Sequence, residues 1–379
     1  DGPLQILTRS LSCELGRGVE AGVFAAGTAC LALRLEHDWH FVEAAAGTLG
    51  RGRGELRPDD YFDLASLSKP LVAALALRLE QAGRFDVEAA VRQLVPEAVG
   101  LPLGRCSWSE LLTHRSGLAA WQPFYESAPE PSGSTAARDW VLSELLKAYE
   151  PEQRGTAVYS DLGYILLGWA LERAAGMSLS DLLQAELTDP LQLTDSLFFA
   201  SQRADRDWQS RCVPTGWSAW RGRNLCGEVH DDNCSLLGGV AGHAGVFGTA
   251  SAMARFAAAY LDAGKQRPSL FDSEAVRDAT RARPGGSHKL GWDGVAKQGS
   301  AAGARIDPDG YGHLGFTGTS IWCDPGRQAL LVLLSNRVAV SDDNAAIRVF
   351  RPQFYDALFE SLDSVSAALR RSSSREFVS

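Results

Sequence analysis

Two segments near the amino terminus have the apolar, β-branched and alternating composition of strands. Residues 27–35 (Gly-Thr-Ala-Cys-Leu-Ala-Leu-Arg-Leu) are followed by the polar pair His37-Asp38 and then by His-Phe-Val-Glu-Ala-Ala-Ala. Two such runs around a short turn predict a β-hairpin over 27–48. Near the carboxyl terminus, runs at 311–323 and 328–336 flank Asp324-Pro-Gly326 and predict two more strands joined by a turn.

Helical spacing dominates the middle of the chain. Leu71, Leu75 and Leu79 recur every four residues and Gly83 follows, which predicts a helix from about Ser66 to Gln81. The same patterns predict further helices at 107–113, 135–149, 160–175, 178–187, 250–263, 272–281 and 351–367. Pro- and Gly-rich segments, notably 128–134 and 201–235, are expected to be loops.

Strands at both ends with helices between them predict an α+β fold, in which an antiparallel sheet is flanked by helices and a second lobe is mainly helical. A chain of 379 residues is long enough for two lobes. We expect residues 1–68 and 285–379 to form the lobe with the sheet, residues 69–284 to form the helical lobe, and the active site to lie between them.

Composition narrows the function classes. Apolar residues make up 45% of the chain, charged residues 22%, and the net charge is −9. Arginines are dispersed among acidic residues without a basic block, so nucleic-acid binding is not expected. No run of about 18 apolar residues occurs, so no membrane span is expected. The sequence does not determine the oligomeric state.

Seven cysteines are scattered without a Cys-x-x-Cys pair, at positions 13, 30, 106, 212, 226, 234 and 323. This spacing is typical of buried reduced thiols, although one bridge, such as Cys226 to Cys234, stays open. The chain starts at Asp1 without an apolar leader. Cysteine usage slightly favours the cytoplasm, and a periplasmic or secreted location follows if a leader has been removed.

The first chemical signal is Ser66 followed three positions later by Lys69, one of only five lysines. Residues at i and i+3 share a helix face, so the hydroxyl and the amine can meet. A serine–lysine pair is one way to activate an alcohol nucleophile without histidine. Ser-x-x-Lys alone is a weak signal, because an N-cap serine and a solvated lysine explain it better than a catalytic pair does.

Two further segments follow in order: Tyr159-Ser-Asp161 before a helical run, and His313-Leu314-Gly315 leading into the last strands. With them the chain resembles the serine β-lactamase/penicillin-binding superfamily, and most closely the branch of class C β-lactamases, DD-peptidases and β-lactamase-like esterases. That family orders its motifs as Ser-x-x-Lys, Tyr-x-Asn, and Lys-Thr-Gly or His-x-Gly. The matching landmarks span roughly residues 20–360.

The resemblance implies a role for each matching residue. Ser66 is the nucleophile that becomes acylated, Lys69 keeps it reactive, and Tyr159 carries the proton to the leaving group. A base role for Lys69 requires a pKa below the usual value of about 10.4. The backbone amides of Ser66 and Phe316 would form the oxyanion hole. His313, Leu314 and Gly315 would line one wall of the pocket. The resemblance implies no metal or cofactor.

Three positions depart from the antibiotic-hydrolysing members of the family. Asp161 replaces an asparagine whose amide can donate to a substrate carbonyl, and a carboxylate cannot. Leu314 replaces a threonine that binds a carboxylate. His313 replaces lysine, so a positive charge there would depend on pH. A serine hydrolase for a small neutral ester or amide is therefore favoured. The alternatives are a β-lactamase or D-alanyl-D-alanine carboxypeptidase acting on a lactam or peptide, and a non-catalytic penicillin-binding or sensing protein.

Other candidate sites are weaker. His230-Asp-Asp-Asn233 could be a metal cluster, but consecutive residues converge poorly, and a loop is expected. Gly50-Arg-Gly-Arg-Gly54 lacks the strand, helix and lysine of a phosphate-binding loop. His114 is expected to be buried and to hold a turn, and a position of His243 at the border of the pocket is the less favoured alternative for that residue. Ser68, a rival nucleophile, is expected to point away from Lys69.

Overall fold

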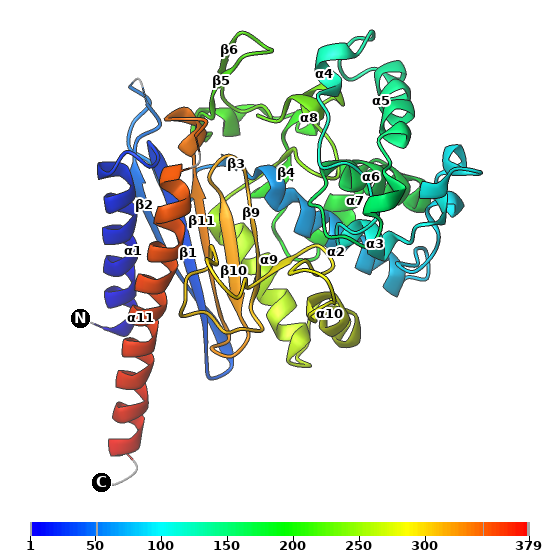
Figure 1. Ribbon diagram of the computed structural model, residues 1–379. Helices are drawn as coiled ribbons and strands as arrows, with labels where there is room; N and C mark the ends of the chain where they lie inside the picture. Colours follow the sequence, from blue (N-terminus) through cyan, green and yellow to red (C-terminus); the bar gives the residue numbers. More distant parts are fainter. Residues whose placement is uncertain (1, 51, 344, 377–379) are drawn as a thin grey trace.

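The computed structural model describes residues 2–50, 52–343 and 345–376. Its centre is a six-stranded antiparallel sheet with the strand order β2-β1-β11-β10-β9-β8 (Figure 1). The strands are β1 (Ala26–Leu35), β2 (Asp38–Gly47), β8 (Asp293–Gly294), β9 (Tyr311–Leu314), β10 (Ser320–Asp324) and β11 (Ala329–Ser335).

The sheet joins the two ends of the chain, as the sequence predicts. β1 and β2 form the expected hairpin, paired from Ala26–Gly47 to Leu35–Asp38. β11 lies on the other side of β1, and both strands are almost wholly buried because helices cover both faces of the sheet.

The prediction of a single strand over 311–323 is wrong, because this segment forms the two strands β9 and β10. The chain turns back between β9 and β10, where the amide of Gly315 donates to the carbonyl oxygen of Thr319 at 2.8 Å. Gly318 takes a φ of +113°, which only glycine adopts easily. The turn matters for function because it places residues 315–319 against the turn that carries Ser66.

Two terminal helices, α1 (Pro3–Glu20) and α11 (Ala345–Glu376), pack side by side on one face of the sheet (Figure 1). α9 (Ala250–Gly264) covers the other face and contacts β1 and β11. α1 was not among the predicted helices, although its buried Leu7, Leu11 and Leu15 follow the four-residue spacing of an amphipathic helix.

A mainly helical region follows β2 in the chain and lies beside the sheet (Figure 1). Its central helices, α2 and α6, are buried on almost every side and pack against each other. The helices are α2 (Ser68–Gln81), α3 (Trp108–Leu112), α4 (Phe124–Ser127), α5 (Thr135–Lys147), α6 (Asp161–Ala175), α7 (Leu179–Leu183), α8 (Asp232–Leu236) and α10 (Ser273–Thr280). The α+β class is thus confirmed. The lobe boundaries at 68 and 285 stay predictions, and α9, from the expected helical lobe, packs on the sheet.

Segment 201–235 holds more regular structure than the predicted loop, namely α8 and the hairpin of β5 (Gly216–Ser218) and β6 (Arg223–Leu225). A three-stranded sheet of β3 (Phe62–Asp63), β7 (Val246–Gly248) and β4 (Leu197–Phe199) leads the chain into Ser66. Within the described residues, no helix is long and apolar enough to cross a membrane. All seven cysteines are free thiols, so Cys226 and Cys234 are not bridged.

Candidate active site

Ser66 lies in a single 3-10 turn, Ala65–Leu67, directly before α2. Ala65 has a φ of +48°, a left-handed conformation that an alanine adopts only when its surroundings impose it. The buried Asp63 accepts a hydrogen bond from the Ala65 amide at 2.8 Å. From the β9–β10 turn, the Thr319 hydroxyl donates to the Leu64 carbonyl oxygen at 3.0 Å. These contacts fix the turn that presents Ser66.

Lys69, the second residue of α2, is completely buried, and its ammonium reaches the serine as the motif predicts. Its Nζ lies 2.8 Å from Ser66 Oγ, 2.6 Å from Asp161 Oδ1 and 3.3 Å from the carbonyl oxygen of His243. The structure thus brings together the first and second motifs, which are more than ninety positions apart in the chain. His243 lies behind Lys69 and contributes its backbone there.

The charges around Lys69 do not give it the lowered pKa that a general base requires. Burial alone lowers its pKa, but the Asp161 carboxylate and the Tyr159 hydroxyl together raise the pKa above the usual value. Tyr159 hydrogen-bonds with Lys69 and Ser66, and burial raises its pKa although Lys69 opposes this. The lowered lysine pKa that a base role requires is therefore not found here, and both groups hold their protons at neutral pH.

Three histidines surround the Tyr159 ring, with ring centroids 4.5 Å (His114), 6.0 Å (His288) and 6.0 Å (His313) away. Burial, with Lys69 adding to it, lowers the pKa of His313 to about 3. The expected pH-dependent charge at 313 is therefore wrong, since this imidazole is neutral at any ordinary pH. His114 is buried as predicted, and its Nδ1 accepts from the Ser160 amide at 3.0 Å. His288 was not predicted.

The end of β9 packs against the turn Ala65–Leu67, called the nucleophile turn because it carries the predicted nucleophile Ser66. A Cβ on Gly315 would lie 1.9 Å from Thr319 Oγ1 and 2.9 Å from the Leu64 carbonyl oxygen, so only glycine fits. In the part of the chain that is described, the amide of Phe316 donates to no acceptor, as an oxyanion-hole donor requires. Leu314 is partly buried, and its side chain packs against the apolar cluster under α1 and α11.

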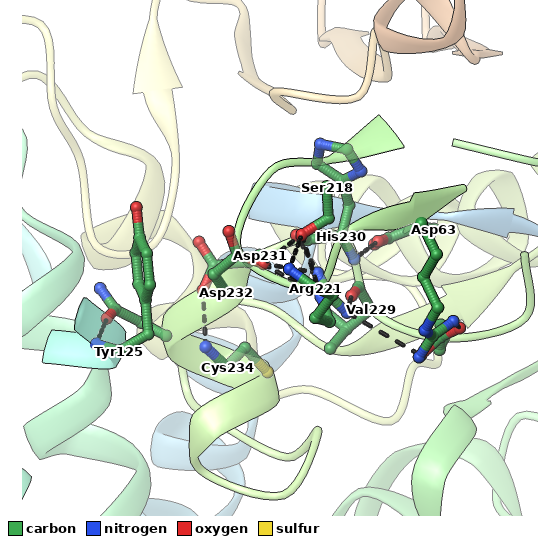
Figure 2. A network of polar contacts seen from close by, with 12 residues as sticks. Asp63, Tyr125, Ser218, Arg221, Val229, His230, Asp231, Asp232 and Cys234 are labelled. Atoms are coloured by element: carbon green, nitrogen blue, oxygen red, sulfur yellow. Dashed lines mark hydrogen bonds and ion pairs between the residues drawn. The ribbon is translucent and has the colours of Figure 1, made fainter. Parts of the chain in front are cut away.

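One side of the site is formed by a polar network that sequence patterns did not reveal (Figure 2). Arg221 donates to the carbonyl oxygens of Val229 and His230, each at 2.7 Å, and pairs with Asp232 at 2.7 Å. The His230 amide donates to Asp63 at 2.6 Å, and the His230 ring stacks on Phe316 with centroids 6.0 Å apart. The network therefore links the nucleophile turn to Phe316, whose amide is the predicted oxyanion-hole donor.

The remaining candidates resolve as follows. Asp231 holds the His243 ring at 2.9 Å, and although burial raises the Asp231 pKa, His243 and hydrogen bonds lower it to about 2. Among the described residues, no group of three or more His, Cys, Asp or Glu side chains could hold a metal ion. Ser68 Oγ accepts from the Val246 amide at 3.3 Å, away from Lys69.

A row of aromatic side chains lies near the Tyr159 segment, namely Trp121, Tyr125 and Trp220. The Asp161 amide donates to the Ala120 carbonyl oxygen at 2.9 Å, which sets the neighbouring Trp121 at the rim. Trp121 is 47% exposed and contacts Tyr125, which contacts Trp220. These rings come from the two segments 115–130 and 201–235, which are far apart in the chain.

Comparisons with known proteins agree with this geometry. The family model described as Beta-lactamase matches residues 19–351. An N-acetylmuramyl-L-alanine amidase of Bacillus subtilis is 31% identical over 311 residues, which cover 76% of this chain and 70% of the relative. A protein of Salmonella paratyphi A, provisionally named a D-alanyl-D-alanine carboxypeptidase, is 28% identical over 301 residues, 73% of this chain and 69% of its own. A class C β-lactamase from Rhodobacter sphaeroides has the same fold, with a TM-score of 0.70 and 19% identity over 93% of this chain and 99% of its own. The family model covers most of the chain and all three motifs, so this protein belongs to the β-lactamase family.

Proposed function

We propose that this protein is a serine hydrolase that cleaves a small ester or amide through an acyl-enzyme on Ser66. The observation that carries the proposal is the contact of one buried ammonium, Lys69 Nζ, with Ser66 Oγ at 2.8 Å, beside a tyrosine that hydrogen-bonds to both residues. A positive charge at this distance stabilises a serine alkoxide.

The protonation states of Lys69 and Tyr159 indicate how the reaction starts. Lys69 and Tyr159 both hold their protons at neutral pH, because each pKa is raised. The coupled cluster of Ser66, Lys69 and Tyr159 must therefore lose one proton before Ser66 attacks a carbonyl carbon. The attack forms the Ser66 ester and expels the leaving group, which Tyr159 protonates. Water, deprotonated by the same group, then releases the acid. Ester turnover should accordingly rise with pH above neutrality.

The surroundings of Ser66 favour an uncharged substrate. His313 is neutral and Leu314 packs into the core, so the third motif offers no cation or hydroxyl for a substrate carboxylate. Asp161 is occupied by Lys69 and adds negative charge. These features argue against efficient hydrolysis of carboxylate-bearing penicillins.

The second candidate is peptidase or amidase action on cell-wall peptides. It is supported by the names of the two relatives, an N-acetylmuramyl-L-alanine amidase and a protein provisionally named a D-alanyl-D-alanine carboxypeptidase. Both names describe the cleavage of an amide. A panel of p-nitrophenyl acetate, D-alanyl-D-alanine peptides and nitrocefin separates ester, peptide and lactam specificity.

The decisive experiment compares Ser66→Ala with Ser68→Ala. We expect Ser66→Ala to reduce p-nitrophenyl acetate turnover by a factor on the order of a thousand or more and to abolish covalent labelling by a fluorophosphonate. Ser68→Ala, two residues away, should keep most activity, since its hydroxyl only accepts from Val246. Unchanged turnover in Ser66→Ala would sink the proposal. Ligand binding by the intact protein, with no turnover on any substrate, would favour a sensing role instead.

A further inference from the structure

Two cysteines outside the three motifs lie together with an arginine. Cys212 is buried and Cys226 is partly exposed, and the Cys226 thiol donates to the Cys212 carbonyl oxygen at 3.3 Å. The side chains also hydrogen-bond to each other. The cysteine that could bridge Cys226 is therefore Cys212 and not Cys234. The Cys234 thiol is directed elsewhere, because it donates to the carbonyl oxygen of Ala244.

Arg53 binds both sides of this pair from the loop after β2. Its Nη1 lies 3.2 Å from Cys226 Sγ, and its Nη2 donates to the carbonyl oxygens of Gln209, Ser210 and Cys212 at 3.0, 2.8 and 3.0 Å. Three backbone acceptors hold the guanidinium in place, so the charge near the sulfur is fixed by the fold. A guanidinium at this distance favours a thiolate.

The two thiols differ in reactivity. The hydrogen bond from Cys212, followed by Arg53, lowers the pKa of Cys226 to about 6, although burial opposes this. Burial raises the pKa of Cys212. A cavity of about 430 Å³ reaches Cys226, lined by Gln209, Gly227 and Val229 among others. Small reagents can therefore reach Cys226, whereas Cys212 is buried.

We propose that Cys212 and Cys226 form a redox-responsive dithiol, in which Cys226 reacts with a hydroperoxide and Cys212 closes a disulfide. The Cys226 thiolate attacks the peroxide oxygen and becomes a sulfenic acid, while the peroxide is reduced and leaves as water or alcohol after taking up a proton. The Cys212 sulfur then attacks the sulfenic sulfur. An S–S bond forms, the S–O bond breaks, and the hydroxyl leaves as water with the proton of Cys212. The dithiol does not require that Ser66 be catalytic.

The first test uses the unmodified chain with hydrogen peroxide. We expect intact mass to fall by about 2 Da, the two hydrogens of one disulfide, and dithiothreitol to restore it. Trypsin cuts after Arg211, Arg221 and Arg223, so Cys212 and Cys226 fall in different peptides that only a disulfide holds together. Finding no such linked peptide, or a loss of 2 Da confined to the peptide 224–255, which holds both Cys226 and Cys234, would overturn the proposal.

Variants assign the two roles. At pH 6, Cys226 should react with iodoacetamide about tenfold faster than a cysteine in the unfolded chain, because its larger thiolate fraction outweighs its lower intrinsic nucleophilicity. Cys226→Ser should remove both the rapid alkylation and the mass loss. Cys212→Ser should stop the oxidation at a sulfenic acid that dimedone traps. Cys13→Ser, at an exposed thiol on α1, is the matched control and should change neither result. Rapid alkylation that persists in Cys226→Ser would refute the assignment.

Discussion

At the scale of single residues, the identity of position 161 decides how firmly Lys69 keeps its proton. Asp161 Oδ1 lies 2.6 Å from Lys69 Nζ and is the largest influence that raises the lysine pKa, while burial works in the opposite direction. Removing the carboxylate charge therefore leaves burial dominant, and the lysine pKa should fall.

Asp161→Asn tests this balance. We expect the alkaline rise of ester turnover to begin at lower pH, because Lys69 loses the charge that holds its proton. The new amide can also donate to a substrate carbonyl, and one such hydrogen bond is worth about 1.4 kcal/mol, or roughly tenfold. The ratio of nitrocefin to p-nitrophenyl acetate kcat/KM should therefore rise by about that factor. Full pH profiles of both substrates give the measurement, and an unshifted profile would contradict it.

Local chemistry of this kind was readable from the sequence, but its electrostatics were not. Ser66 and Lys69 lie one helical turn apart, so their contact follows from spacing alone. The raised pKa of Lys69 depends on Asp161 and Tyr159, which the fold brings from another segment. The neutral state of His313 depends on burial, which a motif does not encode.

At the scale of elements, the β9–β10 turn and the nucleophile turn form one unit. Gly315 allows close approach, and Thr319 and Thr317 donate to the carbonyl oxygens of Leu64 and Asp63. Sequence patterns placed strand residues at 311–323 but missed the turn, because its key interactions are with residues some 250 positions earlier. Conversely, the leucine spacing of α1 is readable from the sequence, although no helix was predicted there.

Gly315→Ala should separate this unit. The added methyl group meets Thr319 Oγ1 and the Leu64 carbonyl oxygen, so overpacking of about 1–3 kcal/mol and a loss of roughly a hundredfold in kcat are expected. Gly16→Ala is the control, because nothing lies within 4 Å of its new Cβ. That helix variant should keep full activity and gain up to about 1 kcal/mol. Urea unfolding and ester kinetics measure both effects, and a fully active Gly315→Ala would contradict the packing argument.

The hairpin of β5 and β6 supports the other rim through Arg221. Arg221→Gln removes donors to Val229 and His230 and breaks the pair with Asp232, so His230 should no longer stay stacked on Phe316. We expect a loss of about 2–3 kcal/mol in unfolding free energy and a raised KM for aryl esters. Thermal unfolding and steady-state kinetics give the two readouts.

Arg223 on the same hairpin provides the comparison. Its pair with Glu228 is exposed, and such pairs contribute little. Arg223→Gln should therefore leave both stability and KM close to those of the parent. Equal effects of the two substitutions would show that Arg221 acts only through surface charge.

At the scale of the whole molecule, Asp63 ties three distant segments together. It is the last residue of β3, its carboxylate accepts from Ala65 in the nucleophile turn and from His230 in the opposite rim, and its carbonyl oxygen accepts from Thr317. Burial raises its carboxyl pKa to about 6, although the two backbone hydrogen bonds oppose this. The fold therefore keeps a carboxylate where its charge is costly, in order to hold both N–H groups.

This carboxyl group predicts opposite pH trends for stability and activity. Its folded pKa of about 6 exceeds its ordinary value of 3.8, so the folded state binds more protons between these values. Its contribution to stability is therefore greatest in acid and falls as pH rises through 4 to 6, by about 3 kcal/mol in total. Activity should instead rise over the same range, because only the ionised group accepts from both Ala65 and His230. Urea midpoints and ester kcat/KM from pH 4 to 8 measure the two trends.

Asp63→Asn isolates the group from all other titrations. An amide has one acceptor atom and one donor group, so it cannot accept from both N–H groups, and activity should be low at every pH. The difference in unfolding free energy between parent and variant should slope with pH between about 4 and 6, because only the parent titrates there. Asp272→Asn, at the exposed N-cap of α10, is the control for the loss of a carboxyl group and should keep full activity, since asparagine caps helices equally well. If parent and Asp63→Asn share one pH dependence of stability and of activity, Asp63 does not titrate near 6, and the link from the nucleophile turn to the rim depends on the backbone alone.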